Sequence, residues 1–447
     1  MYQYGLFTCI NLSNEKKRNL YLIQISHNNT TNFEMSIKKK SETDILEYIN
    51  KQKNHISEKN KYGEVFTNQS LIEELVHQIP DKIWKNPDSK WLDPAAGTGN
   101  FMLFVYNKLL KSLSKKIPNL EKRKNHILDN MLYMVELNPK NSDVLKKLFG
   151  NKANIFNTDF LKSSKELNDA PFDVILGNPP YQVSKKKTYK GSVGNRTLWD
   201  KFLDTILNNN LLKKEGYLGF ITPSNWRRPE HKLYSLLTRN NSLKYLHIYG
   251  KKEGMEHFGV QTRFDLYVVQ EGAQTSKTVI IDEKGEKMKM DVKKWPFLPN
   301  YAYNTIRSIM VPKEKGIKVI FDAGKYDART LSKTKTKKKG HPIVHNITMR
   351  GLGLRYSGKK DKKHFGVPKV LLNFNERQYP HNDYKGTYGM SQLTFGIPIQ
   401  SKDHGEKIIK AIESEKFQEI LEATKWSSFQ TDYRMFSYFS PDFYKKF

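Results

Sequence analysis

Short apolar runs alternate with helical patterns between residues 90 and 270, and this alternation restricts the fold more than any other feature of the chain. The apolar runs have strand length and lie at 90–93, 131–135, 154–156, 172–176, 217–221, 243–248 and 264–269. Alternating strands and helices indicate a mostly parallel sheet with helices on both faces. The sequence therefore predicts a three-layer α/β domain, which the strand at 264–269 is expected to complete.

Composition divides the 447 residues into three parts. Residues 1–60 are mixed, with a strand-like run at 21–25 and a highly charged end, and we expect them to form an N-terminal extension. The α/β pattern occupies residues 61–274, where a capped helix is expected to start at Ser70. Past this point basic runs at 284–294 and 333–339 alternate with aromatic residues. We expect a separate α+β domain over 275–447, with a helical end at 406–423.

A formal net charge of +30 favours a polyanionic partner, because each phosphate that a lysine or arginine neutralises releases condensed counterions. The alternative is a compositional bias toward lysine and asparagine, in which many lysines are only solvated surface. From the charge we expect a nucleic-acid partner.

Several classes of protein are excluded by what the sequence lacks. No apolar run is long enough to cross a bilayer, and the first residues lack the layout of a secretory signal. A single cysteine, Cys9, excludes an internal disulfide framework and a cysteine-built metal site. We expect a cytoplasmic protein with no membrane contact and no metal.

A glycine-rich turn, Asp93-Pro94-Ala95-Ala96-Gly97-Thr98-Gly99-Asn100, follows the first predicted strand. Gly97 and Gly99 permit tight backbone angles and carry no Cβ, so a ligand can approach the main chain closely. Asp93 supplies a negative charge that can pair with an ammonium group. The Walker phosphate loop is excluded because no Lys-Ser/Thr follows the glycines. A plain strand-to-helix turn and a dinucleotide-binding turn both stay open.

Acidic residues follow the next two predicted strands. Glu136 comes after the strand at 131–135, where a carboxylate suits ribose hydroxyls. Its distance from the glycine turn predicts an extra helix around 120–130. Asp159 and Phe160 follow the strand at 154–156, and an acid beside an aromatic ring suits an adenine ring. Taken alone, Glu136 is better explained as a surface charge at a strand end than as a ligand, and the Asp159-Phe160 pair is weak evidence.

The buried strand at 172–176 runs into Asn178-Pro179-Pro180-Tyr181. Two prolines stiffen the loop and leave backbone carbonyls without local partners. The side-chain oxygen of Asn178 and the carbonyl of Pro179 can accept both hydrogens of one planar amine, which favours a pyramidal and more nucleophilic nitrogen. Tyr181 offers a ring for stacking. This loop predicts chemistry on a planar amine or amide.

In their order and type, these motifs resemble the gamma class of N6-adenine DNA methyltransferases, within the Rossmann-like class I S-adenosylmethionine-dependent fold. The segment 62–68 resembles the motif that precedes the glycine turn in that class, with Thr67-Asn68 where members commonly carry Thr-Pro. The segment 214–223 resembles the strand after the catalytic loop, and 258–262 resembles the segment that supplies a second stacking aromatic. The resemblance covers about residues 62–270.

The resemblance implies S-adenosylmethionine as cofactor and a flipped-out adenine of double-stranded DNA as substrate. Thr67 would bind the methionine end of the cofactor, Asp93 its ammonium and Glu136 its ribose. The implied cofactor-binding residues are Thr67, Asp93, Ala95, Gly97, Gly99, Asn100, Glu136, Asp159 and Phe160. The implied catalytic residues are Asn178, Pro179, Pro180, Tyr181 and Phe258. The class further implies a monomer of restriction-modification type, which can have a cognate endonuclease, and a C-terminal target-recognition domain.

Related classes share parts of this pattern. RNA adenine methyltransferases and protein glutamine methyltransferases use the same loop, but the basic C-terminal half and the segment 63–67 favour DNA. Methylation of cytosine N4 usually goes with serine in place of Asn178. A fused restriction endonuclease is a further alternative, although residues 1–60 are short for a nuclease domain. A non-catalytic DNA-binding subunit is disfavoured because the cofactor and loop motifs are intact.

Basic and amide side chains outside these motifs are chemically suited to DNA. The loop 184–196, with three consecutive lysines at 185–187, is a candidate for phosphate contact. Candidates for base reading in the C-terminal half, which are equally suited to plain surface, are Arg350, Arg355, Lys359, Lys360, Asn373, Asn375, Arg377 and Gln378.

Overall fold

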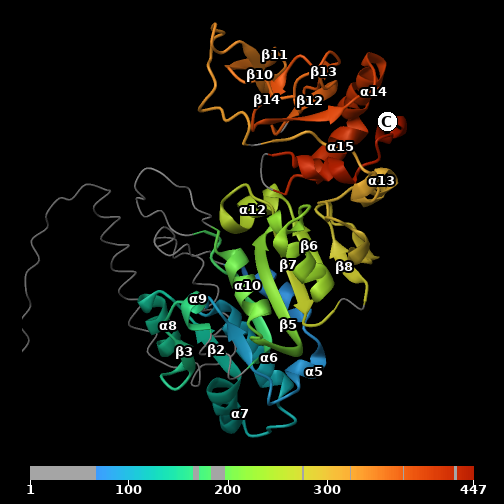
Figure 1. Cartoon of the computed structure of the whole chain (residues 1–447). Coiled ribbons are helices and arrows are strands. Elements are labelled where there is room, and N and C mark those ends of the chain that lie inside the picture. The colour runs from blue at the N-terminus through green and yellow to red at the C-terminus, as the bar shows by residue number, and fades with distance from the viewer. Residues whose placement is uncertain are drawn as a thin grey trace, which may run out of the picture.

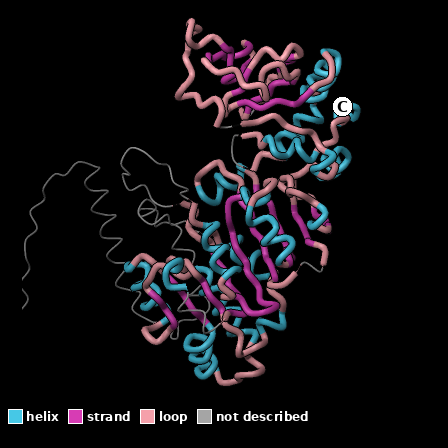
Figure 2. Tube along the Cα trace, in the orientation of Figure 1, coloured by secondary structure: helices cyan, strands magenta, loops and turns pink. Residues whose placement is uncertain are grey.

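The computed structural model describes residues 67–164, 171–182, 197–273, 276–322, 324–375, 377–426 and 430–447. A large sheet flanked by helices forms the N-terminal part of this structure, and a second part with two small sheets packs at one end of it (Figure 1, Figure 2). The strand expected at 21–25 and the loop at 184–196 lie outside the described residues.

The large sheet has nine strands in the order β3-β2-β1-β4-β5-β7-β6-β8-β9. Its strands are β1 (Trp91–Asp93), β2 (Leu132–Val135), β3 (Asn154–Phe156), β4 (Phe172–Gly177), β5 (Leu212–Pro223), β6 (Ser242–Tyr249), β7 (Phe264–Gln270), β8 (Thr278–Ile281) and β9 (Lys287–Met290). Only β7 and β9 run antiparallel to their neighbours within this sheet. The mostly parallel sheet and the strands predicted from the apolar runs are confirmed.

The end of the sheet differs from the prediction. β7 does not complete the sheet at an edge but lies between β5 and β6. β8 pairs in parallel with β6, through Tyr245↔Val279, and β9 pairs with β8. The sheet therefore continues to Met290, past the expected boundary at 274. The basic run that was assigned to the second domain supplies its edge strand.

Helices cover both faces of the sheet, as expected for three layers. They are α4 (Gln69–His77), α5 (Asp81–Trp84), α6 (Asn100–Ser112), α7 (Leu120–His126), α8 (Pro139–Phe149), α9 (Phe160–Ser163), α10 (Trp199–Asn208), α11 (Lys232–Ser235) and α12 (Lys251–Phe258). On β4, Val174 and Leu176 belong to the core under α4 and α6, and Ile175 belongs to the core under α10. This alternation is what a strand buried on both faces requires.

Two local expectations have definite outcomes. The extra helix expected around 120–130 is confirmed by α7 and the π-helical turn Ile127–Met131 that continues it. The helix expected to be capped by Ser70 starts earlier, at Gln69, and its N-cap residue Asn68 makes no side-chain cap hydrogen bond.

The C-terminal part is an α+β arrangement, as predicted. One sheet has the order β11-β10-β14 and the other β13-β12-β15. Its elements are α13 (Tyr303–Ile309), β10 (His341–Thr348), β11 (Gly351–Ser357), β12 (Lys369–Asn373), β13 (His381–Asp383), β14 (Gly389–Met390), β15 (Thr394–Pro398), α14 (Lys402–Glu413) and α15 (Glu415–Ala423). The helical end expected at 406–423 is confirmed and consists of two helices, because Ser414 caps α15 by accepting from the backbone N–H of Phe417 at 3.3 Å.

The two parts share one hydrophobic cluster, which passes from Ile175 in the sheet to Phe417 in α15. A buried polar network lies at the same junction. Arg227 forms an ion pair with Asp265 at 2.8 Å and donates to Asn300 Oδ1 at 2.7 Å, and all three residues are fully buried. Asn300 in turn donates its side-chain N–H to the carbonyl of Lys425 at 3.0 Å. The second part is therefore packed directly onto the α/β part.

No helix in the described part of the chain is long and apolar enough to span a bilayer.

Candidate active site

The sequence motifs converge at the carboxyl end of the sheet. β1 ends at Asp93, and its neighbours β2 and β4 end at Val135 and Gly177. Strand order reverses at β1, since the chain builds toward β3 on one side and toward β4 and β5 on the other. Open α/β sheets bind ligands in the crevice at such a reversal.

The glycine turn after β1 has the left-handed backbone that its residues permit. Gly97 has φ +55° and Gly99 has φ +93°. A Cβ on Gly99 would lie 2.8 Å from Leu145 and 2.9 Å from Phe149 in α8, so this glycine allows close helix packing. A Cβ on Gly97 would meet nothing within 4 Å. The main chain at Gly97 is thus the open side of the turn.

Glu136 is buried and both of its carboxylate oxygens are held. Oε2 accepts the backbone N–H of Gly97 at 2.8 Å, and Oε1 accepts that of Asn138 at 2.6 Å. The side chain of Asn157 donates to the carbonyl of Glu136 at 2.8 Å. The glycine turn and the end of β2 are therefore one rigid unit. Asn138 and Asn157 were missed from the sequence, where the only signal is an asparagine shortly after each of β2 and β3.

Asp93 is 1% exposed, and its Oδ1 accepts the backbone N–H of Ala95 at 3.0 Å. A Cβ on Gly177 would lie 3.0 Å from this oxygen, so a glycine at the end of β4 leaves room for the carboxyl. Burial raises the pKa of Asp93 from 3.8 to about 7, against the hydrogen bond from Ala95, and the nearby charge of Glu136 adds to the rise. A buried acid in this state is stabilised by a cation that binds beside it.

Asp159 and Phe160 have different surroundings. Asp159 is the N-cap of α9: its carboxylate accepts the backbone N–H of Leu161 at 3.1 Å and lies 3.6 Å from Lys162 Nζ. The ring of Phe160 is 2% exposed and stacks on Phe202 of α10, with 5.1 Å between centroids. Phe160 thus packs in the core, and Asp159 lies in the turn between β3 and α9.

Asn100, the first residue of α6, is buried and its Oδ1 has no hydrogen-bond partner. Asn178, directly after β4, is 9% exposed. Its Nδ2 donates to Thr67 Oγ1 at 3.1 Å, and its Oδ1 is buried without a partner. Because the Thr67 contact uses the amide nitrogen, it turns the acceptor oxygen of Asn178 away from Thr67. Buried oxygens without partners are rare and mark places where a ligand hydrogen can bind.

The rings of Tyr181 and Phe258, which come from two elements, meet edge to face. Tyr181 ends the double-proline loop, in which Pro179 is buried and Pro180 partly so, and Phe258 is the last residue of α12. Their ring centroids are 6.2 Å apart at 77°, and Phe258 also packs on Phe264 at 4.8 Å. The Tyr181 hydroxyl is buried with no hydrogen-bond partner.

A polar cluster unforeseen from the sequence lies behind these rings. Glu74 in α4 lies 2.9 Å from the Tyr245 hydroxyl and 2.7 Å from His247 Nδ1, and it also accepts from the Tyr249 hydroxyl. Tyr249 stacks on Phe264 at 4.6 Å. The cluster ties α4 to β6. Its only sequence signal is the alternation of Tyr, His and Tyr along one face of a strand.

Two residues proposed to read bases are instead structural. Asn373 is 1% exposed and donates to the carbonyl of Ile347 at 2.7 Å. Gln378 is 4% exposed and bonds to the backbone of Asn373, as donor at 3.0 Å and as acceptor at 3.2 Å. Their polar groups brace β12 and the loop after it, so they are not available at the surface. Arg350 is exposed at the β10–β11 turn.

Several known proteins are similar to this chain in sequence or in structure. The chain is 23% identical over 321 residues to an uncharacterised adenine-specific methylase of Mycoplasma pneumoniae, over 54% of this chain and 74% of the relative. Its structure is similar to a nuclease-deletion mutant of the type ISP restriction-modification enzyme LlaGI with a DNA substrate mimic, at a TM-score of 0.52 and 11% identity. That likeness covers 82% of this chain and 45% of the LlaGI chain, so this chain spans less than half of that enzyme. The type IIL restriction-modification enzyme MmeI with DNA is similar at a TM-score of 0.47 and 14% identity, over 80% of this chain and 65% of the MmeI chain.

Residues 10–254 match the family model described as Eco57I restriction-modification methylase. The match covers more than half of the chain and includes the glycine turn, the acids after β2 and β3, and the double-proline loop. It confirms the type of enzyme that the motif order resembles. The chain belongs to the Eco57I restriction-modification methylase family.

Proposed function

We propose that this chain transfers a methyl group from S-adenosylmethionine to N6 of an adenine in DNA. The observation that carries the proposal is the buried Oδ1 of Asn178, which has no hydrogen-bond partner. The hydrogen bond to Thr67 orients this amide, and the two prolines follow it in the chain. Membership in a methylase family supports it, as does the Mycoplasma relative, which is described as adenine-specific.

The residues at the carboxyl end of the sheet fit the cofactor. Asp93 would pair with the ammonium of S-adenosylmethionine, and the open main chain at Gly97 would lie against its methionine part. Glu136 would accept from the ribose hydroxyls, and the backbone N–H groups of Gly97 and Asn138 hold its carboxylate in place. Asp159 would bind the adenine amine of the cofactor. Ala95 and the unpartnered Asn100 Oδ1 would line the same groove.

The cofactor supplies a methyl group on a positively charged sulfur. The chain contributes acceptors for the target amine: Asn178 Oδ1 and the carbonyl of Pro179 would each hold one of its hydrogens. Held in this way, the nitrogen lone pair is withdrawn from the ring and becomes available as a nucleophile. As N6 takes the methyl group, the bond between that methyl and the sulfur would break and leave a neutral thioether, and one N6 hydrogen would leave as a proton to solvent. Fixed acceptors of this kind act without reorganisation during the reaction.

Two aromatic rings would hold the target base. Tyr181 and Phe258 meet edge to face, and a base extruded from the duplex would stack on the face of Tyr181 with the Phe258 ring at its edge. Extrusion costs a few kcal/mol of unstacking. Aromatic stacking contributes about 1–3 kcal/mol per base and so offsets much of that cost.

The C-terminal part would choose the target sequence on double-stranded DNA. In the described structure the sheet ends at Met290, so we place the recognition part from about residue 291 onward. The net charge of +30 suits a duplex partner. We propose that the protein acts as a monomer inside the cell, within a restriction-modification system in which a cognate endonuclease can cut the unmodified site.

The deciding experiment supplies labelled S-adenosylmethionine with duplex DNA, RNA or protein, and follows the label into individual nucleosides or amino acids. We expect label in N6-methyladenine of DNA. Label confined to RNA adenine or to glutamine would refute the proposal. Asn178→Ala should retain cofactor binding while turnover falls at least 100-fold, because one of two preorganised acceptors is lost. Asn208→Ala, which removes an exposed amide at the C-terminal end of α10, is the matched control.

A further inference from the structure

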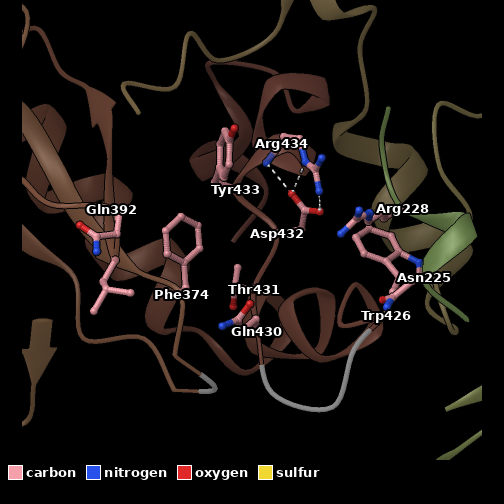
Figure 3. A pocket seen from close by; sticks show the side chains of 11 residues that line it. Asn225, Arg228, Phe374, Gln392, Trp426, Gln430, Thr431, Asp432, Tyr433 and Arg434 are labelled. Carbon is pink, nitrogen blue, oxygen red and sulfur yellow. Dashed lines mark hydrogen bonds and ion pairs between the residues drawn. The ribbon is translucent and has the colours of Figure 1, made fainter. Parts of the chain in front are cut away.

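A cleft of about 250 Å³ lies between the loop after β5 and the C-terminal part (Figure 3). Asn225 and Arg228 come from the first side, and Phe374, Gln392, Trp426 and the segment 430–434 come from the second. None of these residues belongs to the groove proposed for the cofactor. The cleft therefore needs its own explanation.

The cleft holds one cation that is not neutralised. Asp432 is fully engaged by Arg434, whose Nε donates to Oδ1 at 2.8 Å and whose Nη2 donates to Oδ2 (Figure 3). Arg228 has no ion pair among the described residues, and its Nε is buried without a hydrogen-bond partner. Burial lowers the pKa of Arg228, the charge of Arg434 lowers it further, and Asp432 only partly opposes them. A guanidinium in this position is stabilised by an anion.

The remaining lining suits a nucleic-acid strand. Gln392 and the exposed Gln430 present amide groups, and Phe374 and Tyr433 present partly exposed rings. Amides bond to phosphate and base edges, and rings stack on bases. A small inorganic anion would use the arginine but none of these other groups.

The wall that carries Arg228 is connected to the proposed reaction centre. Ser224 and Arg227, in the same turn, bond to Asp265 at 2.8 Å each. Burial raises the pKa of Tyr181, and the charge of the nearby Asp265 raises it further. The turn that carries Arg228 is therefore joined through Asp265 to the surroundings of Tyr181.

We propose that Arg228 binds a backbone phosphate of the DNA strand that carries the target adenine, in this cleft. The inference rests on the proposed function, since it names a contact of the same substrate. Arg228 is a positioning residue: it fixes the strand and touches neither the target base nor the cofactor. The planar guanidinium can hold a phosphate through two parallel hydrogen bonds.

The test measures the equilibrium dissociation constant of full-length protein and a fluorescent DNA duplex at salt concentrations from 50 to 400 mM. For Arg228→Gln we expect the slope of log K against log [salt] to become shallower by about 0.9, and Kd at 100 mM salt to rise roughly five- to tenfold. Arg228→Lys keeps the charge and should restore the slope. At saturating DNA the turnover of Arg228→Gln should stay within about twofold of the parent.

Arg239→Gln is the matched control, because Arg239 is exposed and precedes β6, at the end of the sheet away from the cleft. An unchanged slope in Arg228→Gln, while the parent binds DNA, would overturn this inference and leave the proposed function standing. An equal loss in Arg239→Gln would also overturn it, because the effect would then be general charge removal. A parent protein that binds no DNA would refute the proposed function itself.

Discussion

The buried carboxyl of Asp93 predicts that cofactor affinity falls in mild acid. Burial raises the pKa of Asp93 to about 7. The hydrogen bond from Ala95 opposes this rise, and the charge of Glu136 adds to it. If the cofactor ammonium pairs with the ionised carboxylate, binding must first remove the proton that the free protein carries. Below this pKa the carboxyl is increasingly protonated. Well below it, the affinity for the cofactor falls tenfold for each unit that the pH is lowered.

With a folded pKa of about 7, half of the Asp93 side chains are ionised at pH 7 and about one in a hundred at pH 5. The dissociation constant of S-adenosylmethionine should therefore rise about fiftyfold from pH 7 to pH 5. At pH 6, binding should release about 0.9 proton per cofactor. The amino group of the cofactor stays charged throughout this range.

Isothermal titration calorimetry in two buffers of different ionisation enthalpy measures both quantities at once. Asp93→Asn cannot ionise, so its affinity should be weak and flat between pH 5 and pH 7. Asp88→Asn, a change at an exposed aspartate, should keep the parent profile. A parent protein whose affinity does not change over this range would refute the reasoning, as would an Asp93→Asn variant with the parent profile.

Three further predictions concern the surroundings of the loop. Thr67→Val should lower kcat about tenfold with little change in KM for DNA, because the Thr67 hydroxyl orients the Asn178 amide. Thr67→Ser keeps the hydroxyl and should retain activity. Equal kcat in both variants would contradict this role. Phe258→Ala should lower kcat/KM for DNA about 10- to 100-fold and leave cofactor affinity unchanged, and loss of both would instead indicate misfolding. Glu74→Gln should cost about 2 kcal/mol in urea unfolding. Burial alone would raise the pKa of Glu74, but the hydrogen bonds and charge of His247 hold it below 4.5. This stabilisation is present above pH 4.5 and is lost as the pH falls through the lowered pKa, so equal acid sensitivity of parent and variant would contradict it.

The sheet could be predicted from the sequence where burial alone determines the pattern. The run around Val174 to Leu176 is apolar on both faces because helices cover both sides, and such a run is visible without any tertiary knowledge. β9 is different. Lys287 and Lys289 are exposed on an edge strand, where charge discourages pairing with other chains. In the sequence these lysines are indistinguishable from a basic linker, so the end of the sheet was placed too early.

The candidate active site likewise has residues that could be predicted from the sequence and residues that could not. Gly97, Asp93 and Asn178 lie in compact motifs beside strand ends, so their neighbourhood could be predicted. The bond from Asn178 to Thr67 joins residues 111 positions apart, and Glu74 meets β6 across more than 170. Such contacts depend on tertiary packing, which no local pattern records. The burial of Asn373 was missed for the same reason, because an amide that braces a strand has the same sequence signature as one at the surface.

The late end of the sheet matters for protein engineering. A chimera that exchanged the proposed recognition part at residue 274 would remove β8 and β9 and leave β6 as an unpaired edge, which favours aggregation. A cut at Met290 would keep the sheet but would separate Arg227 from the carbonyls of Leu298 and Pro299. A graft that begins after Asn300 retains both the sheet and this contact with the catalytic half. If the C-terminal part selects the target sequence, as proposed, exchanges of specificity should therefore use a junction after Asn300.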